Sequence, residues 1–348
     1  MTFDNIIGQA ETKQRLIAEW QAGRIPHALM LRGPQGAGKL GLAVAYATLL
    51  LCEHPQADGT PCGECNSCHM ARKFEHPDLH FTFPIVRGTK IKDAKDALSD
   101  FYIKEWRRRL LGGIYFDLND WLADMKAENQ QATYYVAEAD NIQRKLALKS
   151  NQGGRKVMVV WLPEKMNADT ANKLLKIIEE PPAGTHFIMV SEEADKVLGT
   201  ILSRTQQIYV PPLSPEEYNQ AHPPREDMES FDLFVMLMRL SYQRKVKDLR
   251  DWSNHMAGLG RERQKQFLTY CQHLLRENFM FNFQRPELVR LTPTEAAFSK
   301  NFARFINERN VIPIMEEFAR AETDISQNVN ARMVFFDLAL QIIVLLIQ

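Results

Sequence analysis

A glycine-rich segment near the N-terminus has the spacing that proteins use to hold phosphate groups. It reads Gly33-Pro34-Gln35-Gly36-Ala37-Gly38-Lys39 and fits the pattern G-x-x-x-x-G-K. In such a loop, backbone N–H groups at the start of a helix point at the phosphates, and the lysine adds a positive charge. The spacing therefore predicts a phosphate loop with Gly33, Gly36, Gly38 and Lys39 as its binding residues.

The groups that hold a divalent cation beside such a loop are missing. The position after the lysine is expected to be a serine or threonine that ligates magnesium, but it is Leu40. The second ligand is expected to be an acid at the end of an apolar strand, where Trp161 and Leu162 stand instead. Because both changes remove the metal that neutralises charge in phosphoryl transfer, we expect no hydrolysis and weak or no binding of ATP or ADP. The alternative is that Glu164, beyond the strand, supplies the ligand.

Four of the five cysteines form a second candidate site. They are spaced Cys52-x9-Cys62-x2-Cys65-x2-Cys68, so four thiols fall within 17 residues. Four thiolates complete a tetrahedral shell and leave no open position for a reactive water, as in structural zinc sites. We predict structural Zn²⁺ on these four ligands, with an iron–sulfur cluster as the alternative. The remaining cysteine, Cys271, is expected to be a core residue.

Short apolar strands alternate with helical segments over the first ~210 residues, which is the pattern of a parallel α/β sheet. A strand at 28–32 and a helix at 39–51 flank the glycine-rich turn, as a phosphate loop requires. Further strands are expected at 156–162, 186–190 and 207–210, and further helices at 11–22, 167–180 and 196–202. After residue 214 we expect helices alone, at 231–242, 261–279, 294–308 and 333–347.

Residues 84–130 look like an insertion, because they are polar and interrupt the alternation of strands and helices. The segment carries Arg107-Arg108-Arg109, which could contact DNA or a partner. A short run of charge is more simply a solvated helix face, and that is the expectation here.

The overall composition narrows the classes of function. Lys+Arg and Asp+Glu both number 43, whereas a protein that grips DNA alone through its phosphates usually has a basic excess. The first residues lack the features of a signal peptide, and no apolar run reaches the ~18 residues of a membrane span. We therefore expect a cytoplasmic protein without membrane contact, in which any contact with nucleic acid is local or shared with partner subunits.

The phosphate loop, the altered strand and the cysteines together resemble the delta-prime branch of the clamp-loader AAA+ family of bacterial DNA polymerase III. Residues 3–9 are similar to the family's opening box, and the cysteine quartet is similar to the zinc module of its gamma/tau and delta-prime branches. Residues 172–182 resemble the helix before its sensor strand. Residues 200–205 resemble its Ser-Arg-Cys arginine-finger motif, with Thr205 in place of cysteine. The resemblance covers 1–210 apart from the insertion and continues more loosely at 319–346.

This resemblance implies an architecture. It consists of an AAA+ P-loop domain with a parallel sheet over 1–212, a reduced lid or linker over 213–230, and an all-helical collar domain for oligomerisation over 231–348. The first domain would contain the zinc module at 52–68 and the insertion at 84–130.

The resemblance also implies a role. The chain would be a non-hydrolysing stator, not an enzyme by itself, in a hetero-oligomer with gamma/tau and delta subunits that loads the sliding clamp onto primed DNA during replication. Arg204 would act in trans, as an arginine finger in the ATP site of a neighbouring subunit.

Other interpretations stay open at this point. The chain could be an active gamma/tau-like ATPase, a zinc-dependent DNA-binding protein, or a scaffold whose collar helices only hold other subunits together. Arg204 could likewise be structural and paired with a carboxylate of its own chain.

Overall fold

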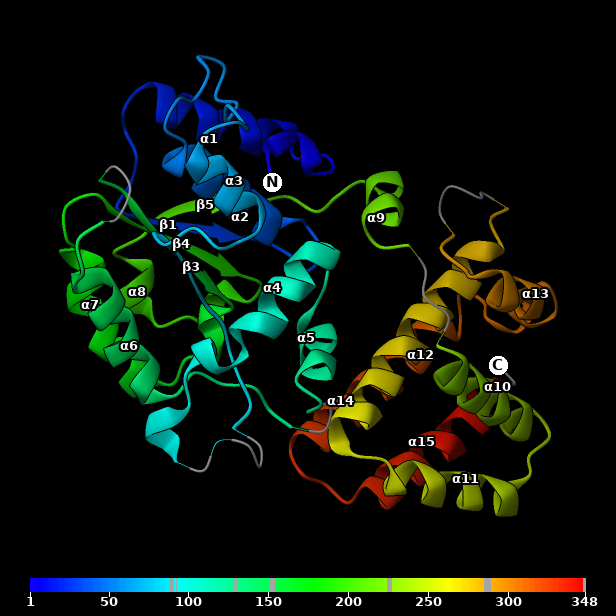
Figure 1. Cartoon of the computed structure of the whole chain (residues 1–348). Helices are drawn as coiled ribbons and strands as arrows, with labels where there is room; N and C mark the ends of the chain where they lie inside the picture. The colour runs from blue at the N-terminus through cyan, green and yellow to red at the C-terminus, as the bar shows by residue number, and fades with distance from the viewer. Residues whose placement is uncertain are drawn as a thin grey trace. The chain divides into compact units, whose positions relative to one another are not determined.

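The computed structural model describes residues 1–87, 91, 93–127, 130–150, 154–223, 227–284 and 289–346. The chain divides into two compact units, Met1–His222 and Pro223–Gln348 (Figure 1). Within the predicted insertion, residues 88–90, 92, 128 and 129 lie outside this description, as does Ile347 at the end of the last predicted helix.

The first unit is built on a five-stranded parallel sheet, so the predicted fold class is confirmed. The strands have the order β2-β3-β4-β1-β5, and every neighbouring pair is parallel. Their bounds are Ala28–Arg32 (β1), Leu79–Thr82 (β2), Lys156–Trp161 (β3), Thr185–Ser191 (β4) and Gln206–Tyr209 (β5). Strand β2 has only four residues and was not predicted from the sequence.

Side chains along the strands alternate between two cores, one on each face of the sheet. Leu29, Leu31 and Val159 belong to the core shared with α1 (Ala10–Gln21) and α2 (Lys39–Leu51). Met30 and Met158 belong to the other core, which they share with α6 (Val136–Ala147) and α7 (Ala168–Glu179). Helices must cover both faces because parallel strands need crossover connections. Figure 1 shows α1, α2 and α3 (Asn66–Arg72) on one side and α6, α7 and α8 (Gly199–Leu202) on the other.

The segment 84–130, predicted as an insertion, contributes buried side chains to the core of the first unit. It forms α4 (Ile103–Gly112) and α5 (Leu118–Asp124), and its ends pair through two backbone hydrogen bonds of 3.0 Å between Ile85 and Thr133. Trp106 and Trp121 have no exposed surface, and their rings pack edge to face at 5.1 Å. The charged residues make the average polarity of the segment high. The tryptophans nevertheless lie on the buried side of amphipathic helices.

The second unit is all-helical, as predicted for the C-terminal third. Its helices are α10 (Met228–Tyr242), α11 (Val246–Gly258), α12 (Arg261–Phe281), α13 (Pro293–Phe302), α14 (Val311–Ser326) and α15 (Ala331–Leu345). Helices α11 and α14 were not predicted. In α14 the proline at position 313 falls in the first turn, where its missing N–H has no intrahelical partner to lose. No described helix has both the length and the apolar character needed to cross a membrane.

The helix predicted at 294–308 ends earlier than expected. Helix α13 stops at Phe302 and is followed by a 3₁₀ turn over Ala303–Phe305. The side-chain amide of Asn282 donates hydrogen bonds of 2.9 Å to the carbonyl oxygens of Ala303 and Ile306. These carbonyls are therefore satisfied from a neighbouring helix rather than by a continued α-helix.

Candidate functional site

The glycine-rich loop joins β1 to α2 and has the backbone of a phosphate loop. Gly36 and Gly38 have φ angles of 78° and 79°, a left-handed conformation that glycine adopts without strain. Gly38 is the N-cap of α2, so the free N–H groups of the first helical turn lie in the loop. A side chain at Gly33 would put its Cβ 2.1 Å from the carbonyl oxygen of Val210, just after β5.

The loop is closed by contacts within its own unit. The ammonium of Lys39, which is only 3% exposed, donates a hydrogen bond to the Pro34 carbonyl. The His222 ring Nε2 lies 3.0 Å from the Gly36 carbonyl oxygen, directly after the short helix α9 (Pro215–Ala221). The remaining cavity has a volume of about 20 Å³, which suffices for about one water molecule.

The two positions that would hold a metal ion are occupied by apolar side chains. Leu40 and Trp161 both line the cavity. The Trp161 ring is 2% exposed and packs against the rings of Trp106 and Phe116 at centroid distances of 5.1 and 5.4 Å. A hydrocarbon chain and an indole offer no oxygen ligand, and magnesium requires oxygen ligands.

Glu164, the alternative source of a metal ligand, is engaged with the backbone. Its Oε1 accepts hydrogen bonds from the N–H groups of Glu192 at 2.8 Å and Glu193 at 3.2 Å. The carboxylate therefore ties the turn after β3 to the end of β4. Its other oxygen, Oε2, is buried without a hydrogen-bond partner among the described residues.

Glu192 is a further residue of this site. It lines the cavity, and burial raises its pKa to about 7, with further contributions from the negative charges of Glu164 and Asp117. Burial also lowers the pKa of Lys39, although the charges of Glu192 and Glu164 oppose this shift. Glu192 lies at the carboxyl end of β4, beside the end of β1, where parallel sheets bind ligands.

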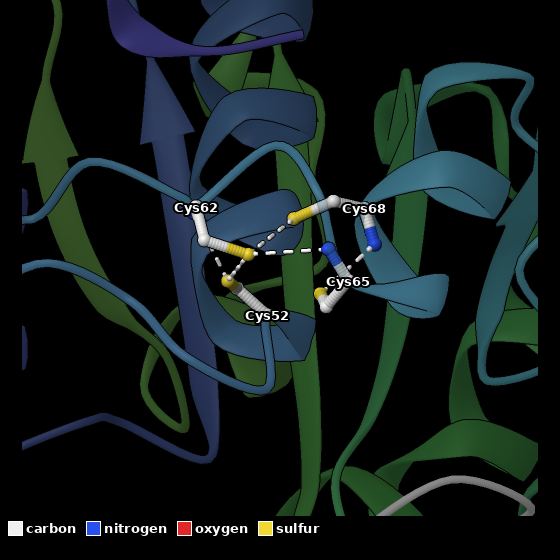
Figure 2. Close-up of side chains that lie close together, drawn as sticks. All are labelled: Cys52, Cys62, Cys65 and Cys68. Carbon is white, nitrogen blue, oxygen red and sulfur yellow. Dashed lines mark hydrogen bonds between the residues drawn. The ribbon is translucent and has the colours of Figure 1, made fainter.

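The four predicted cysteine ligands lie together at the far end of α2 (Figure 2). Cys52 follows the last turn of α2, Cys62 lies in the intervening loop, and α3 supplies Cys65 as its N-cap and Cys68 in its first turn. All four Sγ atoms lie within 4.8 Å of one another, and the Cys52–Cys62 and Cys62–Cys68 separations are 3.5 and 3.9 Å. A tetrahedral ion with metal–sulfur bonds of about 2.3 Å needs sulfur–sulfur distances of about 3.8 Å. The cluster can therefore hold a metal ion.

Backbone N–H groups point at three of these sulfur atoms. The N–H groups of Cys62, Cys65 and Cys68 lie 3.3 to 3.4 Å from the Sγ atoms of Cys52, Cys62 and Cys65, respectively. Such donors favour the thiolate form, and the N–H of Cys65 is the main cause that lowers the pKa of Cys62 to about 6. Burial raises the pKa values of Cys52 and Cys68. A cation would compensate for the charge of these buried thiolates.

A hydrogen-bond chain supports the cysteine cluster and was not predicted. Ser67 donates from its N–H and its hydroxyl to Oε1 of Glu53, at 3.2 and 2.9 Å. The His76 ring accepts from the N–H of Asp78 at Nδ1, at 3.0 Å, so its Nε2 carries the proton and donates to the Ser67 hydroxyl at 3.1 Å. The chain connects the start of α3 to the residue after Cys52. It therefore orients the residues that carry the thiols.

Arg204 lies in the turn between α8 and β5 and is paired within its own chain. Its Nε donates to Glu179 Oε2 at 3.0 Å, and its Nη1 donates to the Thr200 carbonyl at 3.1 Å. The two side chains of the ion pair are 32% and 57% exposed. An exposed pair of this kind contributes less than about 1 kcal/mol, so a stronger anion can displace the glutamate.

Arg204 lies near the amino ends of the strands, whereas the phosphate loop lies at their carboxyl ends. Gln206, the first residue of β5, pairs with Leu29 near the start of β1, whereas the loop follows the end of β1. The length of β1, roughly 16 Å, therefore separates Arg204 from the phosphate loop. The structure thus brings Gly36, Gly38 and Lys39 together in one site and the cysteines in another, and it does not bring Arg204 into contact with its own phosphate loop.

Comparisons with known proteins identify relatives of this chain. Residues 8–214 match the family model described as "DNA polymerase III, delta subunit". The delta' subunit of Escherichia coli K12 is 30% identical over 228 residues, which are 66% of this chain and 55% of that protein. The tau subunit of Salmonella typhimurium is 27% identical over 216 residues, 62% of this chain and 26% of that protein. The chain thus spans about half the length of the delta' relative and less of the tau relative.

A solved structure from Thermotoga maritima, titled as a DNA polymerase III gamma subunit-related protein, was also matched. The match covers 95% of this chain and 97% of that one, with 11% identity and a TM-score of 0.35. Similarity at this level carries no argument about the present molecule.

The raised pKa of Glu192, which is half-buried near Lys39, predicts a specific dependence of stability on pH. Because the folded-state pKa of Glu192 is raised, the folded protein holds a proton that the unfolded chain releases, and stability is lost as the pH rises toward 7. Glu192→Gln should therefore raise the free energy of unfolding by about 1–2 kcal/mol at about pH 8 and change it little at about pH 4.5. Urea denaturation of both proteins at the two pH values measures this difference.

Glu180→Gln is the matched control, because Glu180 is exposed at the end of α7. It should change stability by less than about 0.5 kcal/mol at both pH values. A Glu192→Gln protein that is less stable than the parent at the higher pH would contradict the assignment of a destabilising buried charge.

Proposed function

Because this chain belongs to the DNA polymerase III delta-subunit family, we propose that it is a clamp-loader subunit that hydrolyses no ATP itself. It supports the loading of the sliding clamp onto primed DNA during replication, as a delta-prime subunit alongside gamma/tau and delta subunits. The domain boundaries proposed for this role are 1–212 for the AAA+ domain, 213–230 for the reduced lid and 231–348 for the collar.

The observation that carries this proposal is the apolar filling of the metal position. Leu40 and Trp161 line a cavity of about 20 Å³, and neither offers a ligand for magnesium. Lys39 is buried against the loop's own carbonyl instead of facing an open site. Phosphoryl transfer depends on a metal to neutralise the developing charge, so these features favour a chain without catalysis at its own loop. Gly33, Gly36, Gly38 and Lys39 keep the loop's form with weak or no nucleotide binding.

The proposal assigns Arg204 to a neighbouring subunit. Arg204 lies near the amino ends of the strands, and the phosphate loop lies at their carboxyl ends. Arg204 is therefore too far from this chain's own loop to act on it. Its ion pair with Glu179 is exposed and weak, so the γ-phosphate of a neighbour's ATP can replace the carboxylate. A guanidinium supplied in trans needs no metal site in the chain that supplies it. The tau relatives are the kind of partner that this assignment requires.

A scaffold without any arginine finger is the competing function, and the local pair of Arg204 with Glu179 favours it. The two functions differ in what loss of each partner does. If the Arg204–Glu179 pair is only structural, removing either side chain has the same effect. If Arg204 is an arginine finger, its function is lost only when Arg204 itself is removed.

We propose that the metal held by the four cysteines is zinc. Four thiolates in a closed tetrahedral shell favour zinc in a structural role, and the metal when bound cross-links the end of α2 to α3. The chain's own contribution is to present Cys52, Cys62, Cys65 and Cys68 at bonding separation, with backbone N–H groups that stabilise the thiolates.

Arg204→Ala should lower the clamp- and DNA-stimulated ATPase rate of a loader reconstituted with the gamma/tau and delta subunits. The loss should be at least about twofold and confined to one ATP site, because the other sites keep their own arginines. Steady-state phosphate release measures the rate, and the mass of the complex checks that assembly is unchanged.

Glu179→Ala is the matched control, because it breaks the local ion pair but leaves the guanidinium in place. It should retain the parent rate within about 20%, a change well below the tenfold that 1.4 kcal/mol would give. If Arg204→Ala keeps the full rate, or if Glu179→Ala reduces it equally, the finger assignment is wrong.

The purified chain should contain about one equivalent of zinc, measured by elemental analysis. Replacing Cys62 and Cys65 by serine should abolish metal retention after dialysis, because two ligands are lost. The control is Cys271→Ala, which removes a buried thiol of the second unit and should leave the zinc content unchanged. Iron, or less than about half an equivalent of zinc, would contradict the assignment.

A further inference from the structure

The second unit carries an open groove to which the proposed function assigns no specific occupant. It is formed by α11 and α15, which pack against each other, and has a volume of about 600 Å³. This volume lies within the range of known ligand sites. Figure 1 shows the two helices side by side.

The floor of the groove is apolar and open to solvent. It is formed by Val246 at the start of α11 and by Met333 and Phe336 on α15. Met333 is 70% exposed and Val246 is 46% exposed. Both helices already contribute a separate set of side chains to the core, among them Trp252 and Phe335. The floor residues are therefore apolar side chains that the core cluster of this unit does not include.

The rim of the groove is positively charged. Lys247 and Arg250 on α11 and Arg332 on α15 line it and are exposed, and its lining among the described residues includes no carboxylate. Some arginines of the second unit are paired with acids, as Arg263 is with Asp227 and Glu229. No salt bridge to any of the three rim cations occurs among the described parts of the chain. The groove therefore attracts a negatively charged ligand.

We propose that this groove docks a segment of a partner protein in which apolar side chains are flanked by aspartate or glutamate. Apolar side chains of the segment would cover Met333 and Val246, and its carboxylates would pair with Lys247, Arg250 and Arg332. Methionine suits such a floor because its flexible side chain adapts to the shape of the ligand. This is an inference about the second unit alone and does not depend on the metal or on Arg204.

Two other occupants fit the groove less well. The phosphates of a nucleic acid would use the cations but would leave the valine and methionine floor without a partner. A second copy of the same groove would bring three cations against three cations, which repel each other. An acidic segment with apolar anchors satisfies both the charge and the floor.

The test measures binding of a fluorescein-labelled peptide to the full chain by fluorescence anisotropy. The probe is an amphipathic helix of about 14 residues with a leucine and methionine face flanked by glutamates. We expect a dissociation constant on the order of 10 μM at low salt, weakening as salt is added. Matched peptides with lysine in place of glutamate, or serine in place of leucine and methionine, should bind at least about tenfold more weakly.

Arg250→Glu together with Arg332→Glu should weaken binding of the probe at least about tenfold, because one cation is reversed on each helix. The matched control is Lys300→Glu together with Arg309→Glu, two exposed cations outside the groove, which should stay within about twofold of the parent. Thermal unfolding checks that both variants remain folded.

Three results would overturn the proposal. They are no binding of the acidic probe at about 1 mM, an equal loss of binding in both variants, and displacement of the probe by a single-stranded oligonucleotide that binds the groove more tightly.

Discussion

The buried indole ring of Trp161 determines how the first unit packs beside the phosphate loop. It stands at the end of β3, where a cation-holding acid would face the phosphate loop, and it packs instead against Trp106 and Phe116. The segment between β2 and β3 is thereby joined to the sheet through an aromatic core. The same contact that stabilises this part of the fold fills the position of the metal. An acid introduced at this position alone would place a charge among aromatic rings.

Helix α2 connects the two candidate sites of the first unit. It begins at Lys39, directly after Gly38, and ends at the cysteine cluster, and all of its residues are buried. Because α2 runs antiparallel to the strands, the cysteine cluster lies near the amino ends of the strands. Arg204 lies near the same ends. The carboxyl edge is closed by Lys39 and His222. Contacts within the first unit thus close the loop at the carboxyl ends of the strands, and Arg204 lies near their amino ends.

The features that the sequence predicted well are local. The glycine spacing predicted the turn between β1 and α2, because a left-handed backbone at Gly36 and Gly38 leaves few other residues possible. The cysteine spacing identified a cluster whose sulfur atoms do lie close enough together to bind one metal ion. The continuous apolar run of β3 predicted a strand covered on both faces.

The features that the sequence did not predict arise from contacts between distant segments. His222 reaches Gly36 across 186 positions of the chain, and no local pattern encodes this contact. The charge of Glu192 depends on burial and on Glu164, which lies on a different turn. The segment 84–130 was predicted as an insertion because it is polar and interrupts the alternation of strands and helices, and the burial of its tryptophans by neighbouring elements was not predicted. The pairing of Arg204 with Glu179 is likewise a tertiary contact.

The most direct test of the central claim is the effect of magnesium on ATP binding by the isolated chain. Calorimetric titration with ATP in excess Mg²⁺, and again in EDTA, compares the two affinities. A loop without metal ligands predicts weak or undetectable binding that changes by less than about twofold between the two conditions. Binding that Mg²⁺ strengthens by about tenfold or more would show that this chain's own side chains hold the ion, and would contradict the account.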